Sequence, residues 1–203
     1  MKKLFFLFLF SNITLSELIL EITQGTEDPF RVAIVKFDGN TVIANNIDQI
    51  IKNNLTRTGE FAIFDNIDLL SVPKDENEII FNDFKILNID YLIIGNILSD
   101  KSNITAEYSV FDIKRGSKVR SSTVYGIPNK NRQLAHYISD GIYEEITGIK
   151  GIASTKVLYV TENDYFKLVV ADADGKNEQT LLESTEPIIS PSWSPDSKKV
   201  AYV

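Results

Sequence analysis

The chain begins with an apolar run that is too short to span a bilayer. Residues 4–10 are all apolar, two lysines precede them, and small polar residues follow that fit a cleavage just before Glu17. This order of charged, apolar and small residues is typical of a cleaved signal peptide. A transmembrane anchor is the alternative, but it needs roughly 20 apolar residues. We therefore predict a signal peptide over residues 1–16.

The segment that follows the predicted cleavage alternates apolar and polar residues, with Ile19 as the exception. A period of two predicts a β-strand. Such an arm can be the first strand of its own domain's sheet, or it can add a strand to the sheet of another protein, where backbone hydrogen bonds give affinity. The residues alone leave both alternatives open. The arm consists of Glu17, Leu18, Ile19, Leu20, Glu21, Ile22, Thr23 and Gln24.

Strand and helix patterns then interleave as far as residue 147. Strand patterns cover 31–37, 61–64, 91–98, 104–113 and 118–127, and the last two should form a hairpin. Apolar residues at helical spacing cover 42–57, a short stretch around 81–87, and 134–146, after which Gly148 should end the helix. This interleaving predicts an α/β domain with a mixed sheet and two main helices.

The pattern changes after Gly148, where only short strands separated by turn residues remain. These strands are expected at 156–160, 166–172, near 179–182 and at 198–203. Four strands in about 48 residues is the size of one propeller blade. The sequence therefore predicts the α/β domain to be followed by the first blade of an all-β propeller.

Composition narrows the function classes. The 203 residues carry a net charge of −7, which disfavours nucleic acid as a partner. Cysteine is absent, and this excludes disulfides, thiol catalysis and zinc–thiolate sites. No segment after the signal is long and apolar enough to span a bilayer, so we expect no direct membrane insertion.

Two short patterns invite a metal interpretation. The only histidine, His136, stands four residues before Asp140 on a predicted helix, but a metal would need further ligands. Residues 172–175 read Asp-Ala-Asp-Gly, yet a calcium loop of the EF-hand type would want acids where Val170 and Leu181 stand. We interpret these as a structural histidine and a turn between strands.

No recognised catalytic or nucleotide-binding motif occurs in the chain. It has no G-x-S-x-G elbow, no phosphate-binding loop and no dinucleotide fingerprint. The sequence therefore predicts no catalytic residue, no cofactor and no metal site.

Three stretches resemble one known family. They are the helix end and linker that close with Ile146-Thr147-Gly148-Ile149-Lys150-Gly151, the strand 156–160, and Ser190-Pro191-Ser192-Trp193-Ser194-Pro195-Asp196 with the strand after it. In order and spacing they resemble the TolB family of the Tol-Pal envelope system. One departure is Ser197, where the family pattern usually has glycine, and this puts the turn type in question.

The resemblance implies a non-enzymatic adaptor in the periplasm of a Gram-negative bacterium. In that family the mature N-terminus binds the inner-membrane protein TolA, which by position falls on residues 17–24 here. A six-bladed propeller binds the lipoprotein Pal, and the system maintains the outer membrane and aids envelope constriction in division. The implied organisation is a signal peptide (1–16), an α/β domain with its arm (17–147), a linker (148–155) and an incomplete propeller (156–203), so we expect a fragment.

Two other functions remain open from the residues. Secreted peptidases also use propeller blades with a W-S-P-D turn, in which case a hydrolase domain would follow the propeller. The third option is a secreted α/β domain with unrelated binding duties.

Overall fold

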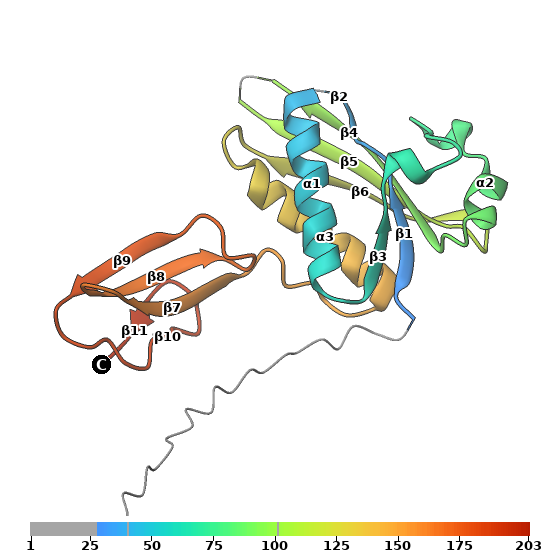
Figure 1. Cartoon of the computed structure of the whole chain (residues 1–203). Coiled ribbons are helices and arrows are strands. Elements are labelled where there is room, and N and C mark those ends of the chain that lie inside the picture. The colour runs from blue at the N-terminus through green and yellow to red at the C-terminus, as the bar shows by residue number, and fades with distance from the viewer. Residues whose placement is uncertain (1–27, 40, 101) are drawn as a thin grey trace, which may run out of the picture.

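The computed structural model describes residues 28–39, 41–100 and 102–203. The predicted signal peptide and the arm over residues 17–24 lie outside the described residues. Figure 1 shows an α/β domain and a smaller all-β unit, joined by a short linker.

The domain is built on a mixed sheet with strand order β3-β1-β4-β5-β6. β1 lies between β3 and β4 and is parallel to both, whereas β4, β5 and β6 are antiparallel neighbours. The predicted mixed sheet and its hairpin are therefore confirmed. The strands are β1 (Phe30–Ile34), β2 (Asp38–Gly39), β3 (Phe61–Phe64), β4 (Tyr91–Ser99), β5 (Ile104–Asp112) and β6 (Ser117–Gly126).

Two long helices cover one face of this sheet and a short helix covers part of the other (Figure 1). On the first face, α1 (Thr41–Arg57) and α3 (Asn131–Thr147) bury isoleucines and leucines against the strands, as their helical spacing predicted. On the second face, Phe84 of α2 (Phe81–Ile86) is fully buried. Two short 3₁₀ turns, Asn66–Asp68 and Glu76–Glu78, lie between β3 and α2.

The first strand is shorter than its apolar pattern predicted. β1 ends at Ile34, and the chain pairs with β4 again at β2. Between them the Phe37 amide leaves the ladder and donates to both carboxylate oxygens of buried Asp48, each at 3.2 Å. The Phe37 ring packs directly against Gly95. A β-carbon at position 95 would lie 2.2 Å from the ring, so only glycine fits there.

The C-terminal unit has a three-stranded antiparallel sheet with order β7-β8-β9. The fourth predicted strand does not join it: Val200–Ala201 (β11) pairs with Ser192–Trp193 (β10) in a separate two-stranded sheet. Beyond this pair, Ile189 and Val203 also exchange backbone hydrogen bonds. Ser190, with a left-handed φ of 53°, lies between the two paired stretches and interrupts the regular pairing. The three strands are β7 (Lys156–Glu162), β8 (Phe166–Asp172) and β9 (Gln179–Ser184).

Across the described ranges, every helix is too short or too polar to cross a lipid bilayer.

Candidate functional site

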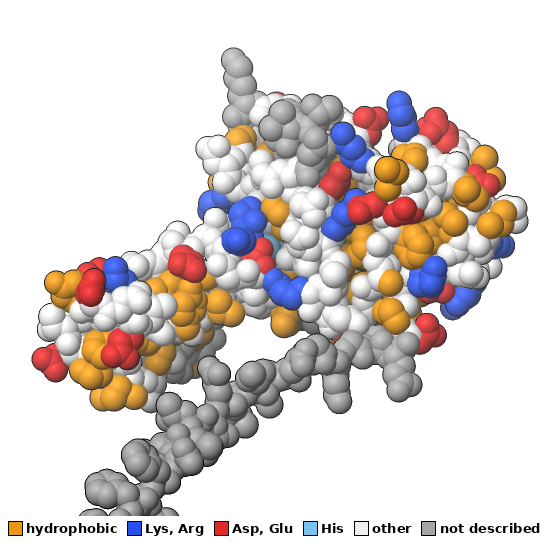
Figure 2. All heavy atoms as spheres, in the orientation of Figure 1, with side chains coloured by type: hydrophobic (Ala, Val, Ile, Leu, Met, Phe, Trp, Pro, Cys, Tyr) orange, Lys and Arg blue, Asp and Glu red, His pale blue; other side chains and the backbone are white. Residues whose placement is uncertain are grey.

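One face of α3 carries the contacts between the α/β domain and the all-β unit. Arg132, His136 and Asp140 follow one another at intervals of four residues, so they form one stripe along the helix. The stripe contacts β8, the turn after it and the linker. Basic and acidic side chains gather at the surface where the two units meet (Figure 2). We call this set of contacts the junction.

Toward the N-terminal end of α3, the junction is a network of ion pairs around Asp172. This residue is 4% exposed and lies at the end of β8. Arg132 on α3 reaches both Asp172, at 3.3 Å, and Asp174, while Lys156 on β7 pairs with Asp172 from another side. The Asn177 amide donates a further bond of 2.8 Å to Asp172. The two carboxylates are thus held by two cations and an amide.

Burial alone would raise the pKa of the Asp172 carboxyl. Hydrogen bonds and charge from Lys156 and Arg132 outweigh burial, so the pKa of Asp172 is lowered. The same balance, with Arg132 as the partner, lowers the pKa of Asp174. Both groups are therefore carboxylates at neutral pH. Their attraction to Arg132 favours the contact between the all-β unit and α3.

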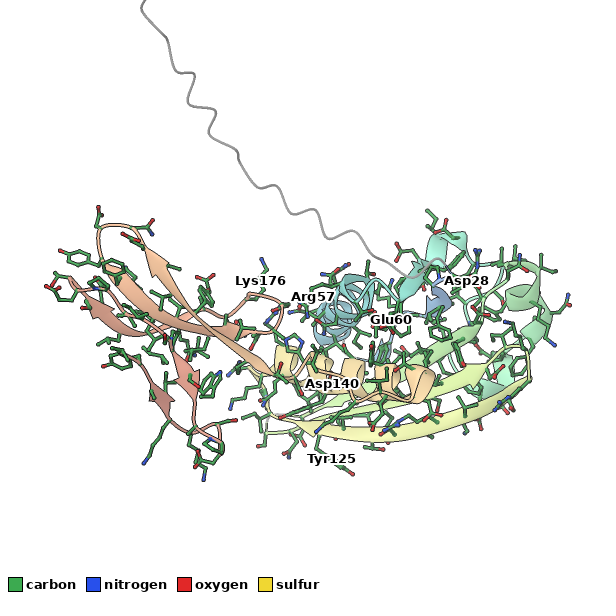
Figure 3. All side chains as sticks on the ribbon, turned by 90° about the horizontal axis from the view of Figure 1, so that it is seen from below. Asp28, Arg57, Glu60, Tyr125, Asp140 and Lys176 are labelled. Atoms are coloured by element: carbon green, nitrogen blue, oxygen red, sulfur yellow. The ribbon has the colours of Figure 1, made fainter. Side chains whose placement is uncertain are left out.

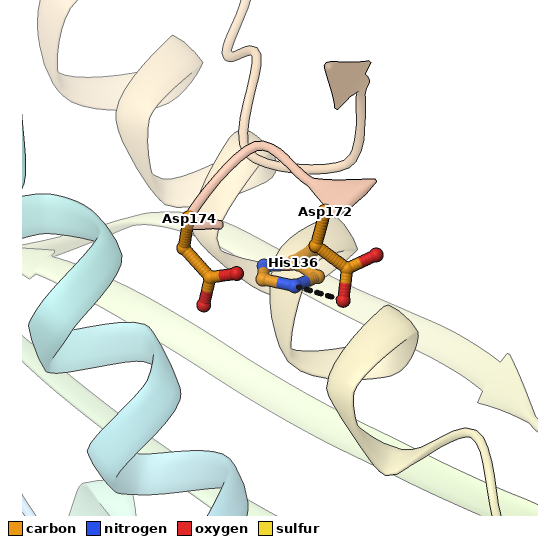
Figure 4. Close-up of side chains that lie close together, drawn as sticks. All are labelled: His136, Asp172 and Asp174. Atoms are coloured by element: carbon orange, nitrogen blue, oxygen red, sulfur yellow. Dashed lines mark ion pairs between the residues drawn. The ribbon is translucent and has the colours of Figure 1, made fainter. Parts of the chain in front are cut away.

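His136 lies beneath this network and is 2% exposed. The Asn54 side-chain amide on α1 lies 2.9 Å from Nδ1 of His136. Nε2 lies 3.6 Å from an Asp172 oxygen, too far for a hydrogen bond (Figure 4). Burial lowers the pKa of His136, and Asp172 and Asp174 offset this only in part.

His136, Asp172 and Asp174 bring three potential ligand atoms within 4.8 Å of one another. A cation such as zinc would need carboxylates with unsatisfied charge. Here Arg132 and Lys156 already neutralise both acids. The donor set therefore fits an ion-pair network between two parts of the chain better than a metal centre.

Asp140, the member of the stripe nearest the C-terminal end of α3, holds the linker. The Asp140 carboxylate accepts the amide hydrogens of Ala153 at 2.6 Å and Ser154 at 3.0 Å. Gly148 ends α3 with a left-handed φ of 74°, as predicted. Figure 3 labels Asp140 on α3, on the side from which the linker leaves.

The His136–Asp140 pair, which we set aside as a metal motif, does not form: Asp140 turns to the linker and His136 faces Asp172 instead. The Asp-Ala-Asp-Gly stretch is a turn, as predicted, with Gly175 at a φ of 75° and its amide bonded to the Asp172 carbonyl. Sequence reasoning missed that both turn acids bind α3, although the four-residue spacing on that helix was a usable signal.

Residues 17–24, the predicted partner-binding arm, lie outside the described residues. The first described residue, Asp28, lies apart from the all-β unit (Figure 3). The strand that follows it, β1, is central in the sheet, and β3 beside it has no second strand partner among the described residues. The described chain therefore begins at β1, one strand in from the edge that β3 forms among the described strands.

Comparison with known proteins gives consistent matches along the chain. Residues 18–119 match the family described as TolB amino-terminal domain, and residues 143–203 match the TolB beta propeller domain. The Tol-Pal system protein TolB of Alcanivorax borkumensis is 41% identical over 193 residues, which is 93% of this chain and 44% of that protein. The corresponding Pseudomonas aeruginosa protein is 36% identical over 91% of this chain.

A solved structure agrees with these matches. The crystal structure of TolB from Acinetobacter baumannii superposes with a TM-score of 0.81 at 30% identity, covering 90% of this chain and 45% of that one. This chain spans about half the length of the curated relatives it matches. The order of the two matched regions, the fold and the sequence identity together show that the chain belongs to the TolB family.

Proposed function

We propose that this chain is part of a non-enzymatic periplasmic adaptor of the Tol-Pal system. The observation that carries the proposal is the succession of a TolB amino-terminal domain and TolB propeller strands in one chain, with relatives named as Tol-Pal system proteins. The organisation we propose is a signal peptide over 1–16, the α/β domain over 17–147, a linker over 148–155 and propeller strands over 156–203.

The adaptor has two partners in this proposal. A TolA-type inner-membrane protein binds the arm over residues 17–24, and a Pal-type lipoprotein binds the propeller. The system thereby maintains the outer membrane and aids envelope constriction in division. The arrangement of the chain supports this division of labour, because Asp28 lies apart from the propeller strands (Figure 3).

The chemistry of the described residues supports a role without catalysis. The only histidine is buried and faces a carboxylate that two cations and an amide already hold. A general base must reach the proton of a substrate, which this imidazole cannot do while the junction is closed.

The test is capture of the purified periplasmic domain of TolA from the same organism by the mature chain. Deleting residues 17–24 should reduce capture at least tenfold, because the strand that adds to the partner's sheet is lost. Circular dichroism should show the α/β domain still folded. Undiminished capture by the deleted chain would reject the arm as the binding segment.

Matched single substitutions test the strand geometry of the arm. Leu20→Gln removes a side chain from the apolar face of the alternating pattern, and Glu21→Gln changes the opposite face. We expect the first to weaken TolA binding about tenfold or more and the second less than threefold, since the apolar face supplies the buried contacts. Equal effects would contradict an extended strand.

A further inference from the structure

Two cavities adjoin along the N-terminal half of α3. One, of about 530 Å³, opens at the junction, between α3 and the residues that end β8 and begin β9. The other, of about 380 Å³, lies between the end of β6 and α3. Lys130 and Gln133 line both cavities, so the two form one continuous groove. Each volume falls within the range of roughly 300–1,000 Å³ that is typical of small-molecule sites.

The half of the groove beside β6 is aromatic. Tyr125 at the end of β6 is 76% exposed, Tyr137 on α3 is 46% exposed, and Ile127 lies between these two elements. Figure 3 shows the Tyr125 side chain pointing outward from the sheet. The Gln133 amide donates to the Tyr137 hydroxyl at 3.0 Å, which fixes that ring in place. This half therefore offers flat apolar faces to a ligand, at little cost in side-chain entropy.

The half of the groove at the junction is polar, and several of its side chains are unused. Across the described residues, the side chains of Asn129, Ser154 and Gln179 make no hydrogen bond, and that of Lys130 makes neither a hydrogen bond nor an ion pair. Amide and hydroxyl groups can both donate and accept hydrogen bonds. A ligand hydroxyl does the same, so this half suits a ligand that is rich in hydroxyl groups.

The charges along the groove are balanced. In the network around Asp172, two cations already face two carboxylates. The other charged side chains that line the groove are Lys130 and Glu178, one of each sign. An anionic ligand would meet Glu178 and Asp172, and a cationic one would meet Lys130 and Arg132. Charge complementarity therefore favours a neutral ligand.

We propose that the groove binds a neutral oligosaccharide. A pyranose ring has apolar C–H faces, which match the rings of Tyr125 and Tyr137, and a rim of hydroxyl groups, which match the unused amides of Asn129 and Gln179. The two halves of the groove follow one another along α3, so neighbouring sugar units of one chain can occupy both. The inference does not rest on the partners proposed above, since neither the arm nor a complete propeller contributes to the groove.

The experiment is a titration of the full mature chain, labelled with ¹⁵N, followed by nuclear magnetic resonance. The probes are cellotetraose and tetra-N-acetylchitotetraose, which are neutral, and tetragalacturonic acid, which is anionic. We expect at least one neutral probe to shift the amide signals of residues 125–137 and 177–180, with a dissociation constant on the order of 1 mM. No shift of these signals at probe concentrations roughly tenfold higher would overturn the proposal. Tighter binding of the anionic probe would overturn its neutral class.

Matched tyrosine variants test the aromatic half. Tyr137→Ala should weaken binding at least about fivefold, whereas Tyr137→Phe keeps the ring and should stay within about threefold of the wild type. Tyr165→Ala is the control, because Tyr165 is also 46% exposed but lies on the turn between β7 and β8 and lines neither cavity. Equal dissociation constants for Tyr137→Ala and Tyr165→Ala would overturn the proposal. Circular dichroism should show all three variants folded.

Gln179→Ala tests the polar half of the groove. The variant should weaken binding about threefold or more, because a ligand hydroxyl loses its amide partner. Thr180→Ala is the control, since Thr180 is the next residue on β9 and lines neither cavity. Equal effects of the two variants would overturn the assignment of this half.

A second copy of the chain is the other occupant that exposed tyrosines could take. Sedimentation velocity of the wild type and of Tyr137→Ala distinguishes it from a sugar. We expect both to be monomers. A wild-type dimer that Tyr137→Ala dissociates would assign the aromatic half to self-association and overturn the oligosaccharide proposal.

Discussion

Gly151 of the linker lies so close to Asp140 of α3 that a β-carbon at position 151 would stand 2.5 Å from the Asp140 Cα. Real side-chain carbons do not approach backbone atoms so closely, so the linker can lie against the helix only with glycine here. This close approach brings the Ala153 and Ser154 amides to the Asp140 carboxylate.

Gly151→Ala should therefore push the linker away and break both hydrogen bonds to Asp140. We expect the free energy of unfolding to fall by about 1–3 kcal/mol in urea denaturation. Amide exchange at Ala153 and Ser154 should become faster. Gly126→Ala is the control, because its new carbon would meet Leu134 at 3.4 Å, which needs only a small adjustment. Equal losses in the two variants would contradict the steric explanation.

Gly141→Ala should destabilise the contact between α3 and the sheet. A β-carbon at this position would lie 2.2 Å from the Tyr108 hydroxyl oxygen, and Tyr108 is 3% exposed, so its ring cannot move aside freely. We expect a loss of about 1–3 kcal/mol in urea denaturation.

A second substitution tests the cause of that loss. Without the hydroxyl, the nearest Tyr108 atom would be Cζ at 3.5 Å, which is an ordinary contact. Gly141→Ala should therefore cost much less stability when it is made in Tyr108→Phe than when it is made in the wild type. Additive losses would place the strain elsewhere.

Asp48→Asn should stabilise the protein at neutral pH. Burial raises the pKa of the Asp48 carboxyl to about 6, although hydrogen bonding from Phe37 lowers it. A raised carboxyl pKa means that the charged form destabilises the fold above pH 6, and that this cost disappears as pH falls toward the unfolded value of 3.8. Asparagine keeps the acceptor without the charge, so we expect a gain of about 1–3 kcal/mol at pH 7.5.

The pH dependence of that difference is the decisive measurement. Urea denaturation of the wild type and of Asp48→Asn should give converging stabilities between pH 7.5 and pH 4.5. A difference that stays constant over this range would show that Asp48 does not titrate there.

Ser197→Gly should stabilise the last hairpin. Ser197 has a left-handed φ of 56°, and its amide bonds to the Ser194 carbonyl at 2.8 Å. Left-handed backbone costs a residue other than glycine about 1–2 kcal/mol of stability. Glycine avoids this cost, but its greater freedom in the unfolded chain cancels part of the gain. We expect a net gain of about 0.5–1 kcal/mol, followed by Trp193 fluorescence on heating. Ser192→Gly, within β10, should give a loss instead.

Ser197 stands in the left-handed backbone region that glycine usually occupies. The turn forms with serine at position 197, because the Ser194 hydroxyl donates to the Asp196 carboxylate at 2.6 Å and these two groups accept the Lys199 and Lys198 amides respectively. These local bonds offset the strain at Ser197. The sequence pattern raised the question of turn type, but only the backbone angle answers it.

Elements with strong periodicity were predictable from the sequence, and side-chain contacts over long distances were not. The apolar spacing of α1 and α3, the hairpin of β5 and β6, and the helix end at Gly148 follow from local patterns. The interruption between β1 and β2 does not, because the Phe37 amide there binds Asp48, eleven residues away, and not the neighbouring strand.

The junction illustrates the same limit. Arg132, His136 and Asp140 could be placed on one face of a helix from their spacing alone. Their partners could not, since Asp172 is 40 residues beyond Arg132 and is brought there by the fold of the all-β unit. The arm over residues 17–24 remains a prediction from pattern and resemblance.

The position of β1 has a mechanical consequence. A pull on Phe30 along the strand meets parallel ladders on both sides, to β3 and to β4, so the bonds of both ladders are loaded together in shear. An antiparallel edge strand pulled from one end would instead unzip one bond at a time. A protein tethered through this end can therefore bear tension along β1 without its sheet peeling apart.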